Sequence, residues 1–323
     1  MARAYLELFA GGAACALALM GGPRVVPPVG YMGGKRKLAP SILGTVGLRP
    51  GQGADRVLLV DAGEWGGVWS EVVRDGRGLA DRLLGWEGRD PSDLWRELAA
   101  AGRPEDPQER AAAYLWLQGR AASCTPVWWE GSGMRMTHRN GVGGPCEQHQ
   151  PRLIMPEKGN RGVPVKDAVE RSTRKASTSR HASSGVTRPA TVAARILRAS
   201  ASLAGARVDR RHPSAAEVAA WLGTPGDLSD VVVMLDPPYV GATRYEATCT
   251  RDQVVSLAED YRRLGASVVV CEAEALPELL ALGWHALDLR EASTTEGKPE
   301  WLTCSDPPQR VAVPRQLKLW SVA

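Results

Sequence analysis

The tetrapeptide Asp236-Pro237-Pro238-Tyr239 carries the residue types that point most directly to a reaction. Two consecutive prolines make the turn rigid, because each ring fixes a backbone dihedral angle. The Asp236 carboxylate and the Pro237 carbonyl can therefore converge as acceptors on a planar amino group, while Tyr239 offers a ring on which a base can stack. Two acceptors shift electron density toward the nitrogen of a weakly nucleophilic base amine as it attacks an electrophilic methyl group. The structural alternative is a proline-terminated strand with an incidental Asp and Tyr.

A glycine-rich segment, Glu7-Leu8-Phe9-Ala10-Gly11-Gly12, and the later Asp61 have the types and placement of a nucleoside site. Glycines let the backbone approach a ligand closely, and an acid at the end of the next strand can accept both hydroxyls of a ribose. On its own, a glycine-rich turn before a helix is more often only a turn. Gly33-Gly34-Lys35 resembles a triphosphate cradle only superficially, since the chain has no GxxxxGK[ST] motif.

Basic side chains gather in one part of the chain. Residues 131–200 carry 13 Lys and Arg against 4 Asp and Glu, whereas the rest of the chain carries 27 against 32. A basic block inside an otherwise acidic protein is typical of a region that binds a polyanion. For 171–188, which is rich in Ser, Thr and Arg, a solvated or disordered loop is an equal alternative. The candidates for contacts with phosphates or base edges are Arg135, Arg139, Asn140 and Arg152.

The same region contains residue types that can bind zinc. Cys146 and His149 have a spacing that suits this metal, and a loop-rich insertion would gain stability from it. The spacing of the other two candidates, Cys124 and His138, is irregular, so we expect no metal and keep this set as an alternative. The chain has six cysteines and no CxxC pair, which predicts reduced thiols.

Apolar runs and helix-compatible spacings alternate along the chain. Strands are predicted over 5–9, 57–60, 231–235, 267–271, 284–289 and 301–304. Helical patterns cover 13–20, 35–43, 62–73, 91–123, 191–204, 215–222, 251–263 and 275–282, and periodicity is absent between 125 and 190. This alternation predicts an α/β fold with a doubly wound, mainly parallel, Rossmann-like sheet whose final strand pair forms an antiparallel edge. In such sheets ligands bind beyond the carboxyl ends of the strands, where the residues named above would meet.

The composition excludes several classes of protein. A chain of 323 residues with 44% hydrophobic and 24% charged residues has the size and composition of one or two globular domains, not of a peptide hormone or a knottin. No apolar stretch approaches the ~18 residues that a membrane span requires. Residues 10–20 imitate a signal peptide, but Glu7 and the Gly11-Gly12 pair interrupt the apolar core, so we expect a cytoplasmic protein with no membrane partner.

Four segments together resemble one enzyme family. They are YLELFAGGAA at 5–14, YMGGKRKL at 31–38, VLLVD at 57–61 and VVVMLDPPYVGATRY at 231–245. This set is similar to the Dam-like DNA adenine methyltransferases, whose signatures are a GGK-containing motif, an E-P-F-x-G-G-G-like cofactor loop, a strand ending in Asp, and DPPY. Residues 111–117 look like the family's helix before its DNA-recognition region, and 300–303 look like its closing E-x-L strand. The resemblance covers nearly the whole chain apart from about 125–190.

The resemblance implies a class I methyltransferase fold, S-adenosyl-L-methionine as cofactor and double-stranded DNA as partner. It implies a catalytic domain in two parts, 1–100 and 201–323, around a helical and basic target-recognition insertion at 101–200, in a monomer or weak dimer. An orphan methylase of a bacterium or bacteriophage, which protects DNA from restriction, would suit this chain. The flipped adenine would be held by Asp236, Pro237, Pro238 and Tyr239, with direct methyl transfer and no catalytic cysteine. The cofactor would be bound by Glu7, Phe9, Ala10, Gly11, Gly12, Tyr31, Gly33, Gly34, Lys35 and Asp61.

The chain departs from the family pattern in several places. The GGK motif follows the glycine loop, whereas in most relatives it precedes that loop, and ELFAGG stands in place of EPFxGGG. Cys271-Glu272 replaces the usual Leu-Ser-Asn, and Gln118-Gly119 stands where an Asn-rich recognition sequence is usual. The target sequence is therefore open. The alternatives are methylation of the cytosine amino group, an RNA substrate, and a catalytically inactive DNA-binding protein with the same fold.

Overall fold

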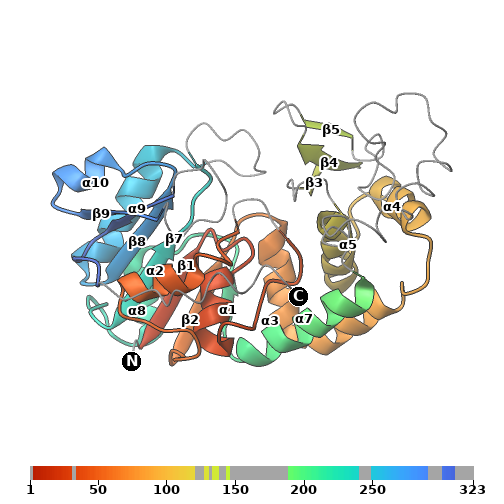
Figure 1. Ribbon diagram of the computed structural model, residues 1–323, viewed down its shortest axis with the longest axis horizontal. Coiled ribbons are helices and arrows are strands. Elements are labelled where there is room, and N and C mark those ends of the chain that lie inside the picture. The colour runs from red at the N-terminus through yellow and green to blue at the C-terminus, as the bar shows by residue number, and fades with distance from the viewer. Residues whose placement is uncertain are drawn as a thin grey trace, which may run out of the picture.

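The computed structural model of the chain describes residues 3–30, 34–120, 127–130, 133–137, 143–145, 188–239, 249–289 and 300–309. Its centre is a seven-stranded sheet in the order β6-β2-β1-β7-β8-β10-β9 (Figure 1). The strands are β1 Ala4–Leu8, β2 Arg56–Val60, β6 Arg207–Asp209, β7 Val231–Leu235, β8 Ser267–Glu272, β9 His285–Asp288 and β10 Trp301–Cys304. The predicted α/β fold with a mostly parallel sheet is thereby confirmed, and it is compatible with a Rossmann-like arrangement.

Strand direction changes at one side of the sheet. The strands β6, β2, β1, β7 and β8 run parallel, whereas β10 is antiparallel to both β8 and β9. The predicted antiparallel pair at the edge is confirmed: β9 is the outermost strand, and β10 lies between β8 and β9. The sequence did not predict β6, because a three-residue strand that pairs only with β2 is too short to have a recognisable period.

Helices cover both faces of the sheet. Alternate strand residues point to opposite faces, and both faces carry apolar side chains, so each face packs against helices. One apolar cluster contains Tyr5 and receives α1 (Ala14–Gly21), α2 (Ala39–Thr45), α3 (Glu64–Leu84) and α7 (Pro189–Ser202). The other contains Leu6 and receives α8 (Ala215–Leu222), α9 (Arg251–Arg263) and α10 (Pro277–Ala281). Burial on both faces explains the continuous apolar strands. In the part of the chain that the structure describes, no helix has the length and apolar character to cross a membrane.

Local sequence features explain where two helices begin and why the predicted length of α3 was too short. The side chains of Ser214 and Thr250 form capping boxes at the start of α8 and α9, whose predicted bounds are confirmed. Helix α3 extends to Leu84, well beyond the predicted end at residue 73. It contains a non-helical residue, Asp75, and glycines at 76 and 78, which obscure the period in the sequence.

A second group of elements packs beyond α3. It comprises α4 (Pro91–Ala100), α5 (Pro107–Arg120) and a three-stranded antiparallel sheet of β3 (Val127–Glu130), β4 (Gly133–Thr137) and β5 (Gly143–Pro145) (Figure 1). Trp129 is buried there, with its ring centroid 6.3 Å from that of Tyr114 and its indole N–H donating to the Gly102 carbonyl at 3.1 Å. The absence of periodicity between 125 and 190 was therefore misleading for β3 to β5, because strands of three to five residues are too short to show a recognisable period.

Candidate functional site

The carboxyl ends of β1, β2 and β7 meet at one edge of the sheet, since β1 lies between the other two. The backbone N–H of Ala10 donates to the carbonyl of Val60 at 2.9 Å, and the N–H of Asp236 donates to the carbonyl of Leu8 at 3.1 Å. These bonds join the turns that follow the three strands. The structure therefore brings the glycine loop, Asp61 and Asp236 together, as the sequence predicted.

The glycine loop has an unusual backbone that neighbouring side chains hold in place. The φ angles of Phe9, Gly11 and Ala13 are 59°, 45° and 48°, a left-handed conformation that costs energy in residues with a Cβ. The N–H of Gly11 donates to Oδ2 of Asp61 at 2.8 Å, and Nε1 of Trp69 donates to the Gly11 carbonyl at 2.7 Å. Such strain persists only where the surroundings over-determine it, which is typical of a binding loop.

Asp61 anchors this loop and keeps capacity for a ligand. Its second oxygen, Oδ1, accepts from the N–H of Gly63 at 2.9 Å. Burial raises the pKa of Asp61, while backbone N–H groups of Gly11, Gly63 and Gly66 oppose that rise. Each carboxylate oxygen offers two lone-pair sites, and Gly11 and Gly63 each occupy one of them, on different oxygens, while the N–H of Gly66 donates to the Gly63 carbonyl at 3.1 Å. Each oxygen can therefore still accept from one hydroxyl. Asp61 is partly exposed and fits the predicted role at a ribose.

His212 lies beside the glycine loop and was missed from the sequence. Its ring centroid is 4.0 Å from that of Phe9. Its Nδ1 is buried and has no hydrogen-bond partner among the described residues. Burial lowers the pKa of His212 to about 4, so the imidazole is neutral at pH 7. The Phe9 and His212 rings are suited to contact the face of a purine. The Nδ1 of His212, which has no partner among the described residues, is suited to a hydrogen bond with the purine edge. The sequence analysis did not identify His212 as a site residue because it follows β6, a strand that periodicity did not predict.

Four side chains at the end of β7 form a compact group, here called the lysine cluster: Lys35, Asp236, Tyr239 and Glu300. The Nζ of Lys35 lies 2.6 Å from Oδ1 of Asp236 and 3.5 Å from Oε1 of Glu300. It also lies 4.9 Å from the ring centroid of Tyr239, whose hydroxyl donates to Oε1 of Glu300. The sequence predicted three of these residues as site residues and did not predict Glu300 as one.

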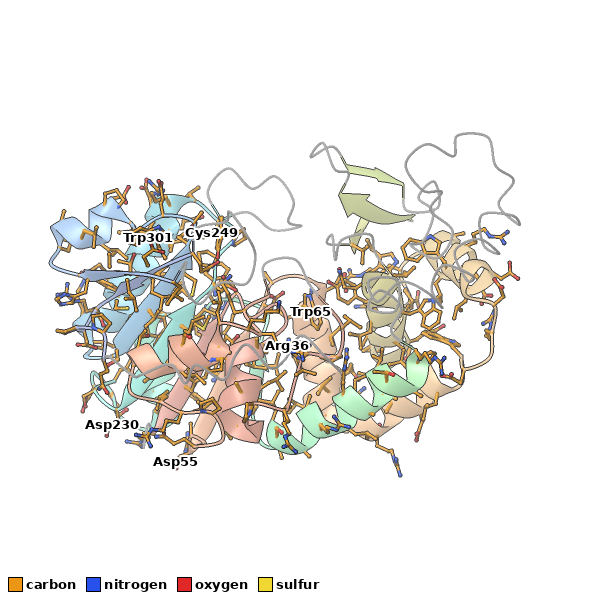
Figure 2. The ribbon with its side chains drawn as sticks, viewed as in Figure 1. Arg36, Asp55, Trp65, Asp230, Cys249 and Trp301 are labelled. Atoms are coloured by element: carbon orange, nitrogen blue, oxygen red, sulfur yellow. The ribbon has the colours of Figure 1, made fainter. Side chains whose placement is uncertain are left out.

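The topology explains how Glu300 reaches the cluster. Figure 2 shows Asp55 and Asp230, which precede β2 and β7, at one end of the sheet and Trp301 at the other end. Trp301 begins the antiparallel strand β10 and pairs with Glu272, the last residue of β8. The start of β10 is therefore at the carboxyl ends of the parallel strands. Glu300, directly before β10, lies at the same edge as Asp236 for this reason.

Lys35 is buried, and the other three residues of the lysine cluster are partly exposed. The side chains of Lys35, Asp236 and Glu300 are 4%, 19% and 14% exposed. Burial raises the pKa of Asp236 to about 6, and the neighbouring lysine opposes this rise. Burial by itself would lower the pKa of Lys35, but the surrounding acidic groups hold it well above its usual value. At pH 7 the cluster therefore contains an ammonium ion on a deprotonated Asp236.

Glu7 is buried behind the loop and holds helix α1. Its Oε2 accepts from the N–H of Ala16 at 2.6 Å, and the N–H of Cys15 contributes a further bond. Burial raises the pKa of Glu7 to about 8, and the charge of Asp236 adds to this rise. The structure thus places the Glu7 carboxyl at the start of α1. Its described hydrogen bonds go to the helix backbone.

The other predicted residues divide between described and undescribed parts of the chain. Gly34 is exposed, Ala10, Gly12 and Pro237 are buried, Pro238 is partly exposed, and Arg135 lies in β4. Among the described residues, no group of three or more His, Cys, Asp or Glu could hold a metal ion. The predictions for the following residues lie outside the described ranges: Tyr31, Gly33, Cys124, His138, Arg139, Asn140, Cys146, His149 and Arg152.

Comparison with known proteins adds no relative. No model of a protein family matches this chain, and no curated protein matches it. The functional argument therefore rests on the residues and the geometry of the sheet edge.

Proposed function

We propose that this protein is a class I, S-adenosyl-L-methionine-dependent DNA methyltransferase that methylates the exocyclic amino group of a flipped-out adenine. One observation carries the proposal: the partly exposed Asp236 carboxylate and the Tyr239 ring share a sheet edge with a strained loop that Asp61 anchors. An amine acceptor beside an aromatic ring and a nucleoside-type loop is the combination that base methylation needs. The resemblance to Dam-like enzymes leads to the same activity.

Asp236 and Tyr239 have complementary roles in this proposal. The Tyr239 ring stacks on the base, and the Asp236 carboxylate accepts a hydrogen bond from the target amine. The acceptor raises electron density on the nitrogen, and with a pKa of about 6 it can take the proton that the alkylated nitrogen releases. Flipping is needed because the amine is engaged in base pairing inside a duplex. The expected partner is double-stranded DNA.

The residues of the glycine loop fit an S-adenosyl-L-methionine nucleoside. Asp61 retains lone pairs for two ribose hydroxyls, Phe9 offers a ring, and His212 offers a buried nitrogen that has no partner in the part of the chain that the structure describes. Gly12 packs closely on Pro27, since a Cβ at this position would lie 3.3 Å from its Cγ. When bound, S-adenosyl-L-methionine supplies an electrophilic methyl group on a sulfonium.

The described cysteines support direct transfer, without a covalent intermediate on the enzyme. Burial raises the pKa of all four described cysteines. The rise takes the pKa of Cys15 and Cys271 well above the ordinary value and that of Cys304 to about 12, and Cys249 shifts in the same direction. These side chains are therefore thiols at pH 7, and a thiol is a poor nucleophile compared with a thiolate. An enzyme that methylates an amine needs no such nucleophile, because the amine attacks the methyl carbon itself.

The α5 and β3 to β5 elements, which lie within the predicted insertion at 101–200, are the proposed target-recognition region. Their sheet lies apart from the seven-stranded sheet (Figure 1) and includes part of the basic block. Lys and Arg would neutralise phosphates, and a few would reach base edges. Methylation of a cytosine amino group is the second candidate, because the same acceptors serve either base.

The test is incorporation of methyl groups from labelled S-adenosyl-L-methionine into unmethylated DNA, followed by digestion and nucleoside mass spectrometry. We expect N6-methyladenine. Cytosine methylated on its amino group would keep the mechanism and change the base. Absence of incorporation, together with absence of cofactor binding by calorimetry, would favour a catalytically inactive DNA-binding protein.

A further inference from the structure

The amine acceptor of the proposed reaction is occupied in this structure by another amine. The Nζ of Lys35 lies 2.6 Å from Oδ1 of Asp236, with its side chain 4% exposed. An ammonium group at hydrogen-bond distance from this oxygen uses the interaction that the amino group of a flipped base requires. The base cannot make that interaction fully until the lysine has moved.

A second acceptor for the lysine is already in place. Oε1 of Glu300 lies 3.5 Å from the same Nζ, and its side chain is 14% exposed. A buried ammonium that lost Asp236 with no replacement would be strongly destabilised, because removing one partner of a buried pair leaves an uncompensated charge. Glu300 avoids this cost, since a shift of about an ångström brings Nζ from 3.5 Å to ordinary hydrogen-bond distance.

The Glu300 side chain is also fixed relative to the base platform. The Tyr239 hydroxyl donates to Oε1 of Glu300, and the Lys35 Nζ lies 4.9 Å from the centroid of the Tyr239 ring. The tyrosine therefore contacts both the lysine and its second acceptor. A base that stacks on this ring would arrive beside the ion pair that it must open.

We propose that Lys35 is a displaceable occupant of the target-amine position, and that Glu300 is the positioning residue that receives its ammonium when the base engages Asp236. This inference rests on the proposed function and deepens it. Lys35 keeps the Asp236 carboxylate ionised and paired until a base amine replaces it. Glu300 then holds the positive charge near the acceptor without covering it.

Glu300→Gln separates this role from support of Tyr239. Glutamine keeps an oxygen that accepts from the tyrosine hydroxyl, but it removes the negative charge that would receive the lysine. We expect kcat for methylation of unmethylated DNA to fall at least tenfold, with the KM for DNA and the melting temperature nearly unchanged. Glu300→Asp, which retains the charge, should recover part of the rate.

Two comparison variants define the alternatives. Tyr239→Phe removes the hydroxyl that bonds to Glu300 and keeps the ring, so it should cost less in kcat than Glu300→Gln. Glu274→Gln removes an exposed charge that pairs with Arg251 at 2.7 Å, and it should leave kcat unchanged. Equal losses in Tyr239→Phe and Glu300→Gln would mean that Glu300 only supports the tyrosine, and they would overturn the inference.

The acid limb of the pH profile tests separately whether the charge of Glu300 acts on Asp236. The groups that influence Asp236 or lie near it are Lys35, Glu300, Tyr239, Glu7, Cys15 and Cys271. The charge of Glu300 raises the pKa of Asp236, so Glu300→Gln should move the acid limb of kcat/KM to lower pH. An active wild type with an unaltered Glu300→Gln overturns this inference alone. An inactive wild type overturns the proposed function and this inference with it.

Discussion

At the residue scale, Asp236 is the side chain on which the proposed chemistry depends. We predict that Asp236→Ala lowers methyl transfer at least ~100-fold, as expected for loss of an electrostatic contact to the reacting group. Cofactor affinity should change little, because the loop is anchored by Asp61. Labelled methyl transfer and calorimetry measure the two quantities. The control is Asp230→Ala, an exposed aspartate at the opposite end of β7 (Figure 2). Equal loss of transfer and of cofactor binding would assign Asp236 a structural role.

The raised pKa of Glu7 leads to a prediction about the pH dependence of stability. Its pKa is about 8 in the folded chain, so between the ordinary pKa of a glutamate and pH 8 the folded state holds a proton that the unfolded state releases. Its contribution to the free energy of unfolding therefore decreases as pH rises through this window. Glu7→Gln keeps an acceptor for the helix and does not titrate.

We expect Glu7→Gln to gain stability relative to wild type on going from pH 5.5 to pH 8, by an amount on the order of 3 kcal/mol. Urea denaturation at the two pH values measures the difference. The exposed variant Glu274→Gln should show no such change. A pH-independent difference for Glu7→Gln would contradict a buried, protonated Glu7.

At the scale of elements, the turn from β2 into α3 positions Asp61. A Cβ at Gly66, in the first turn of α3, would overlap the Asp61 carbonyl oxygen, whereas a Cβ at Gly67 meets no atom within 4 Å. We predict that Gly66→Ala lowers the free energy of unfolding by ~1–3 kcal/mol and weakens cofactor binding. The matched control, Gly67→Ala, should raise stability by ~0.5–1 kcal/mol, because alanine is the better helix former. Similar melting temperatures for the two variants would show that α3 moves freely away from Asp61.

At the scale of the whole molecule, charge is unevenly distributed: residues 131–200 carry a net positive charge and the rest of the chain a net negative one. Because phosphate contacts release counterions, DNA affinity should fall steeply with salt in the wild type. We predict that Arg135→Ala with Arg139→Ala weakens binding and reduces the salt slope by about 2, close to one per phosphate contact. Fluorescence anisotropy across a salt series measures both. Arg263→Ala, an exposed arginine on α9 outside the block, should leave the slope unchanged. An unaltered slope in the double variant would assign these arginines to a linker.

The sequence by itself determined the alternation of strands and helices, the parallel core of the sheet and the meeting of the glycine loop, Asp61 and Asp236 at one edge. These follow from local periodicity and from the rule that parallel strands end on the same side. Only the tertiary structure decided that β10 inserts between β8 and β9, that β6 exists, and that β3 to β5 form a sheet. Glu300 and His212 therefore escaped the sequence analysis, because each reaches the site through a strand placement that long-range pairing determines. The contact of Lys35 with Asp236 was likewise decided by folding, since burial and charge complementarity depend on neighbours far apart in the chain.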